Sequence, residues 1–96
     1  MRPSIAFEQN REFVREAVSR YPARNPRIFG SVLHGTDKDG SDVDILIDAL
    51  PGATLLDLIG LERELEQQLG VRVQVLTPSE LGRRFRDKVL AEAQPV

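Results

Sequence analysis

Hydrophobic and polar residues along this 96-residue chain alternate with two periods, which separate predicted helices from predicted strands. Apolar residues recur at three- to four-residue spacing in the helical segments, as in helices that bury one face. They alternate singly with polar residues in the shorter segments, as in strands. The pattern predicts helices over residues 4–21, 54–69 and from 77 onward, and strands over 27–31, 42–48 and 71–76.

The helix over 54–69 has the clearest start and end signals in the chain. Thr54 is a good N-cap, Asp57 follows three residues later as in a capping box, and Gly70 suits a C-cap. Its apolar stripe is interrupted by one acidic residue. We expect the acidic residues of this helix to lie on its outer, solvated face: Glu62, Glu64 and Glu66.

The strand over 42–48 has two different faces. Val43, Ile45 and Ile47 point to one side, and the aspartates at 42, 44 and 48 point to the other. Leu46 shares the acidic face, so that face is predicted to be partly covered. Two early strands joined by a short turn, and a third reached through a helix, indicate an α/β fold with a small mixed sheet of three or more strands flanked by helices.

The length and composition of the chain limit the compartments and ligands that can be expected for it. A chain of this length predicts a single domain over 1–96. No apolar run approaches the roughly 20 residues of a membrane span, and the N-terminus has no signal-peptide core, so we expect a cytoplasmic protein without a membrane partner. The absence of cysteine fits that compartment and excludes thiolate metal sites. A net charge of −2 gives no general attraction to nucleic acid.

Candidate chemistry lies at the ends of two predicted strands. Asp42 and Asp44, two residues apart, place both carboxylates on one face about 6–7 Å apart along the strand. Such a pair can converge on Mg²⁺, and without a cation one carboxylate would take up a proton. Gly30 allows a phosphate to approach the backbone, and Ser31 offers a hydroxyl and an N–H. A short helix over 32–35 would add free N–H groups for the same anion.

Taken alone, a Gly-Ser pair is usually a turn and an Asp-x-Asp is usually a solvated strand end. Together they supply a phosphate clamp and metal carboxylates, the parts needed for nucleotidyl transfer. The string FGSVLHGTDKDGSDVDILID resembles the nucleotidyltransferase core of the DNA polymerase β superfamily, whose motif is G-S-x10-D-x-D. The chain is most similar to the minimal nucleotidyltransferases of bacteria and archaea. LGVRVQVLTPSEL and FRDKVLAEA extend this resemblance to residues 12–94.

The resemblance implies a nucleotidyltransferase-like fold, ATP as donor and Mg²⁺ as cofactor. Gly30 and Ser31 would hold the nucleotide phosphates, Asp42 and Asp44 would hold Mg²⁺, and Gly35 and Ser41 are further candidate nucleotide contacts. Family members are commonly antitoxins of two-gene modules. The partner is an α-helical HEPN-domain toxin, typically a ribonuclease, and some members transfer AMP to one of its tyrosines.

Two positions depart from the family pattern. Gln74 stands where the superfamily usually has a third carboxylate; its amide can ligate a cation but cannot act as a base. Asp48 shares the acidic face but lies about 13 Å along the strand from Asp44, so it is a poor substitute. His34 stands where many relatives have arginine. It is either a weaker phosphate partner or an ordinary loop residue.

Two functional hypotheses therefore stand. The first is an enzyme that transfers AMP or another nucleotide, with activity reduced by Gln74. The second is a binding module that neutralises a HEPN partner by docking. A DNA-binding regulator has little support, because no helix-turn-helix pattern is present.

The last predicted helix carries a basic run with two interpretations: it is either a solvated face or a contact for an acidic partner or nucleic acid. The run consists of Arg83, Arg84, Arg86 and Lys88. The acceptor, the preferred base and any homo-oligomer are not determined by the sequence.

Overall fold

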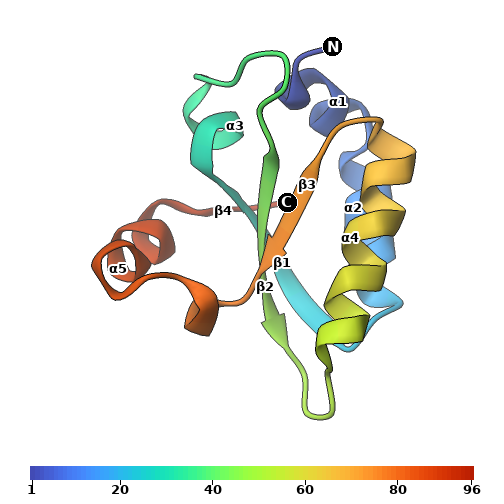
Figure 1. Ribbon diagram of the computed structural model, residues 1–96, viewed down its shortest axis with the longest axis vertical. Coiled ribbons are helices and arrows are strands. Elements are labelled where there is room, and N and C mark those ends of the chain that lie inside the picture. The colour runs from blue at the N-terminus through green and yellow to red at the C-terminus, as the bar shows by residue number, and fades with distance from the viewer.

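A computed structural model describes all 96 residues and contains a four-stranded sheet with helices on both faces (Figure 1). The strand order is β3-β2-β1-β4; β2 and β3 are parallel and the other neighbours are antiparallel. This confirms the predicted mixed sheet. The elements are α1 (Pro3–Gln9), α2 (Arg11–Ser19), β1 (Ala23–Phe29), α3 (Gly30–His34), β2 (Val43–Ala49), α4 (Leu55–Leu69), β3 (Val73–Leu76), η1 (Pro78–Glu80), α5 (Arg83–Glu92) and β4 (Gln94–Pro95).

The two faces of the sheet bury different cores. The larger core lies between the sheet and α1, α2 and α4, and includes Val43, Ile45 and Ile47 of β2. On the other face, α5 lies across from those helices (Figure 1). There Leu46 is completely buried and packs with Phe29 and Leu81. The prediction that the acidic face of β2 is partly covered is therefore confirmed. No helix has the length and apolarity needed to cross a membrane.

The first predicted helix, 4–21, is two helices. Asn10 separates α1 from α2 with φ −124° and ψ 18°, outside the helical region. Its side-chain amide donates to the carbonyl of Ala6 at 2.8 Å, which offers the backbone an alternative to continuing the helix. The apolar spacing missed this break because both helices bury one face in the same core.

Helix α4 has the predicted caps, but its acidic residues are not simply solvated. Thr54 and Asp57 form a reciprocal capping box, and Gly70 ends the helix with φ 73°. Glu62 accepts a hydrogen bond from the backbone N–H of Val75 at 2.9 Å, and Glu66 accepts one from Val73 at 3.1 Å. Strand β3 is an edge strand, so these carboxylates satisfy donors that no neighbouring strand reaches. Glu64 instead pairs with Arg20 and Tyr21.

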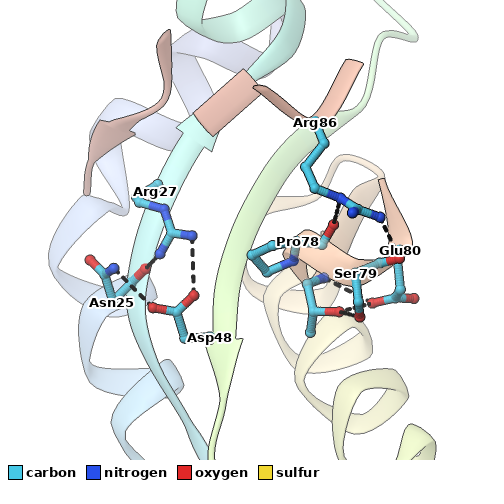
Figure 2. Close-up of polar contacts among 8 residues, drawn as sticks. Asn25, Arg27, Asp48, Pro78, Ser79, Glu80 and Arg86 are labelled. Atoms are coloured by element: carbon cyan, nitrogen blue, oxygen red, sulfur yellow. Dashed lines mark hydrogen bonds and ion pairs between the residues drawn. The ribbon is translucent and has the colours of Figure 1, made fainter. Parts of the chain in front are cut away.

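Several boundaries differ from the sequence predictions. Strand β1 spans Ala23–Phe29 instead of 27–31, so Gly30 and Ser31 begin α3 rather than ending a strand, and β3 begins at Val73 instead of residue 71. The short helix expected over 32–35 is α3. The last predicted helix is a single 3-10 turn followed by α5, and β4 was not predicted. Arg86 joins the last two helical elements: it donates to the carbonyl of Pro78 at 2.9 Å (Figure 2). It also donates to the carbonyl of Leu81 at 3.1 Å, so its guanidinium is held by hydrogen bonds within the chain.

Candidate active site

Strands β2 and β3 place the candidate polar residues in facing rows on one side of the sheet. Asp44 pairs with Gln74, and the next pair on that face is Leu46 with Leu76. Asp42 immediately precedes β2, and the N–H of Val43 donates to the carbonyl of Arg72 at 2.9 Å. Arg72 therefore lies on the same face, with Nε 3.1 Å from Oδ1 of Asp42. Parallel pairing brings four polar side chains from two strands to one edge of the sheet.

Gly30 lies directly against the carboxylate of Asp44. Its φ is +74°, a conformation that favours glycine. A Cβ built on Gly30 would overlap Oδ2 of Asp44 and lie 3.2 Å from its Cγ. Phe29 pairs with Asp44 across the sheet, so the antiparallel register of β1 and β2 creates this approach. Gly30 and Ser31 also begin α3, whose N-terminus has no side-chain cap.

Arg72 is the only positive charge in an ion pair with the two carboxylates, and it contacts Asp42 and not Asp44. Burial raises the pKa of Asp44 to about 6, and the negative charge of Asp42 contributes to the increase. Oδ1 of Asp42 is buried and accepts no hydrogen bond, because the nearby guanidinium of Arg72 is not aligned as a donor. A partly buried carboxylate pair with an unsatisfied oxygen has the ligand type that Mg²⁺ prefers. The residues present therefore fit a divalent cation.

The site offers two carboxylates and no third. No group of three or more His, Cys, Asp or Glu residues is placed to hold a metal ion. Asp48 is engaged elsewhere: its oxygens accept from Asn25 at 3.1 Å and Arg27 at 3.2 Å (Figure 2). The hydrogen bond from Asn25, with that from Arg27, lowers the pKa of Asp48. Gln74, which faces Asp44, supplies only an amide.

The other candidates serve local structure. Gly35 ends α3 with φ 71° in open space. The hydroxyl of Ser41 accepts from the N–H of Lys38 at 3.0 Å and closes the turn before β2. His34 is 3.0 Å from Glu92, which links α3 to α5. The side-chain hydrogen bonds of Ser41 and His34 therefore go to Lys38 and Glu92, not to the carboxylate pair.

A buried clamp that the sequence did not predict holds the loop between α3 and β2. Asp37 has no exposed side-chain surface; it accepts from the N–H of Ser4 at 2.8 Å and from Arg2 at 3.0 Å. Arg2 also donates to the carbonyl of Asp37 at 3.2 Å. The backbone donor at Ser4, with Arg2, lowers the pKa of Asp37. The sequence of this loop, TDKDGS, did not indicate that Asp37 is buried, because a polar turn has the same composition whether its aspartate is buried or exposed to solvent.

Two hollows have candidate site residues, or residues that contact them, in their walls. One, of about 780 Å³, is lined in part by Ser41, Asp39 and Arg72. The other, of about 440 Å³, lies between the sheet and α5 and is lined in part by Gly30 and the aromatic side chains of Phe29 and Phe85. Neither includes Asp42 or Asp44 in its wall. One hollow thus borders Arg72, and the other borders Gly30.

The sequence matches one protein family along most of its length. A family model described as nucleotidyltransferase domain matches residues 10–96. The chain is 40% identical over 78 residues to the protein adenylyltransferase MntA of Thermococcus cleftensis, covering 81% of this chain and 79% of that protein. It is 39% identical over 77 residues to a Methanocaldococcus jannaschii protein assigned as a protein adenylyltransferase, covering 80% and 83%.

The fold is also similar to solved structures. One structure assigned as a minimal nucleotidyltransferase aligns with a TM-score of 0.86 at 39% identity, covering 97% of this chain and 95% of that one. A toxin–antitoxin structure with AMP-PNP aligns with a TM-score of 0.76 at 18% identity, covering 90% and 71%. At that identity the second match shows a shared fold only.

Proposed function

Because the chain belongs to the nucleotidyltransferase domain family, we propose that it is an Mg²⁺-dependent adenylyltransferase that transfers AMP from ATP to a HEPN-domain toxin. The observation that carries the proposal is the close approach of Gly30 to Asp44 beside Asp42. The uncapped N-terminus of α3 and a carboxylate pair suited to Mg²⁺ are adjacent, as nucleotidyl transfer requires.

The proposed roles follow from the positions of the residues. Gly30 and Ser31 hold the phosphates of ATP, and Asp42 and Asp44 hold the metal ion. Mg²⁺, when bound, neutralises phosphate charge and polarises the reacting phosphoryl group. The acceptor hydroxyl oxygen forms a bond to the α-phosphorus, the bond from that phosphorus to the bridging oxygen breaks, and pyrophosphate leaves.

Gln74 limits the proposed reaction. It faces Asp44 across the sheet, so it stands beside the proposed metal ligands. A neutral amide accepts no proton, so the proton of the acceptor hydroxyl passes to solvent. General-base help is worth about 10²–10⁴-fold in rate, and its loss predicts slow transfer.

A HEPN toxin is the proposed partner because of the relatives. One is named MntA, and a solved relative of the same fold is a toxin–antitoxin complex. A second candidate function, inhibition by docking alone, is favoured by exposed apolar side chains at the start of α4. Leu55 is 67% exposed and Leu56 is 78% exposed. Such side chains, clustered at one helix end, suit a protein interface.

The test is label transfer to a purified HEPN-domain toxin, using ATP labelled on the α-phosphate and Mg²⁺. We expect the parent to label the toxin and Asp42→Asn to fail. Asp87→Asn is the matched control, because that aspartate is exposed on α5 and lies in the wall of neither hollow. Absence of label with all three proteins, together with equal inhibition of the toxin, would contradict the enzyme and support the docking module.

A further inference from the structure

We propose that Arg72 is a phosphate-binding residue and that the site works with a single Mg²⁺, the guanidinium supplying positive charge that a second metal ion would otherwise supply. This inference rests on the proposed function, since it concerns the same nucleotide site. It assigns a role to a residue that lies outside the G-S-x10-D-x-D motif.

The position of Arg72 is set by the backbone. The carbonyl of Arg72 accepts the N–H of Val43, so its side chain projects beside that of Asp42 on the face that carries Asp44 and Gln74. Nε lies 3.1 Å from Oδ1 of Asp42. The side chain is nevertheless 76% exposed, so most of the guanidinium is free to meet a ligand.

The charges of the site favour one metal ion. Two-metal sites hold their ions about 3.5–4 Å apart with shared anionic ligands. Here Gln74 is neutral, Asp48 is paired with Arg27, and no third acidic ligand is present. One Mg²⁺ needs only one or two carboxylates and completes its shell with water and phosphate oxygens. A single Mg²⁺ leaves part of the triphosphate charge uncompensated, and a guanidinium matches phosphate oxygens in a bidentate geometry.

The contact between Arg72 and Asp42 can break when a cation binds to Asp42. Oδ1 of Asp42 is buried and unsatisfied although Nε is close, so the ion pair lacks an aligned hydrogen bond. A cation bound at that oxygen would repel the guanidinium and leave it free to bind phosphate. Exposed ion pairs contribute little to folding, so Arg72 can be replaced without unfolding the chain.

The experiment measures binding, not turnover, with Mn²⁺ and a non-hydrolysable ATP analogue. Mn²⁺ per chain is counted by electron paramagnetic resonance, and nucleotide affinity is measured by calorimetry for the parent, Arg72→Gln, Arg72→Lys and Arg63→Gln. Arg63 is an exposed arginine of α4 and provides the matched control. We expect one Mn²⁺ per chain, nucleotide affinity at least about tenfold weaker in Arg72→Gln, partial recovery in Arg72→Lys, and no change in Arg63→Gln.

Mn²⁺ affinity without nucleotide separates this role from a structural one. In Arg72→Gln it should be unchanged or tighter, because a neighbouring positive charge has been removed. Two Mn²⁺ per chain, or equal nucleotide affinity in the parent and Arg72→Gln, would overturn the inference and leave the proposed function standing. A parent that binds no nucleotide with Mn²⁺ would overturn both.

Discussion

Gly30 and Asp44 occupy adjoining space: the hydrogen at Cα of Gly30 faces the carboxylate, and any larger substituent would meet Oδ2 of Asp44. The contact joins the start of α3 to the second residue of β2, fourteen positions later in the chain. The proposed phosphate-binding residues therefore contact the proposed metal ligands, so a substitution in one group should change ligand binding by the other.

Replacement of Gly30 tests this contact. Gly30→Ala should lower the melting temperature and abolish the thermal stabilisation given by Mg²⁺ and ATP, because the methyl group displaces Asp44. Gly52→Ala is the matched control: its φ is also positive, at 89°, but a Cβ there meets nothing within 4 Å. Both substitutions destabilise the backbone by about 1–2 kcal/mol. Any further loss of melting temperature in Gly30→Ala, measured by scanning fluorimetry, therefore reports the contact with Asp44. A full ligand-induced shift in Gly30→Ala would contradict the assignment.

The raised pKa of Asp44 predicts how stability depends on pH in the absence of metal. The folded chain keeps a proton on Asp44 that the unfolded chain releases, since the folded pKa is about 6 against 3.8. The contribution of this group to stability is therefore present below about pH 4 and is lost as pH rises through 6. Asp44→Asn should raise the melting temperature of the metal-free protein at pH 7.5 by at least about 4 °C.

The same substitution should have a smaller effect at pH 4.5, because Asp44 is then protonated in the folded chain and only partly ionised in the unfolded chain. Mg²⁺ should stabilise the parent at pH 7.5 and leave Asp44→Asn unchanged. A lower melting temperature for Asp44→Asn at pH 7.5 would show that the negative charge is compensated within the protein.

Gln74→Asp should restore a third carboxylate beside Asp44. We expect the initial rate of AMP transfer to rise at least about tenfold, a cautious fraction of what a general base supplies. The metal-free variant should be less stable than the parent at pH 7.5, because three like charges then share one face. Gln67→Asp, on the exposed side of α4, controls for the added charge. A fast parent with no gain in the variant would remove Gln74 from the proposed mechanism.

The buried clamp of Asp37 and Arg2 should stabilise the loop that leads to Asp42. Asp37→Asn should lower the melting temperature, because Arg2 and the N–H of Ser4 lose a charged acceptor. Asp39→Asn, which removes an exposed ion pair in the same loop, should change it little. Equal melting temperatures for the two variants would show that the clamp is not needed.

Local signals were enough to predict much of this protein. The caps of α4 at Thr54 and Gly70 depend on residues three or four positions apart, and the structure has both. The two faces of β2 depend only on alternation along one strand. The G-S-x10-D-x-D spacing indicated which residues to examine, because the family motif is continuous in sequence. Each of these features is decided within a short stretch of chain.

Tertiary structure decided the contacts between stretches. That Gly30 opens a helix and meets Asp44 depends on the register of β1 against β2. That Arg72 stands beside Asp42 and Gln74 faces Asp44 depends on the parallel pairing of β2 and β3, which are separated by the whole of α4. The sequence singled out Gly30, Asp42, Asp44 and Gln74 but not Arg72, and it could not show which of them meet. Strand register is set by packing across the sheet and not by neighbours along the chain.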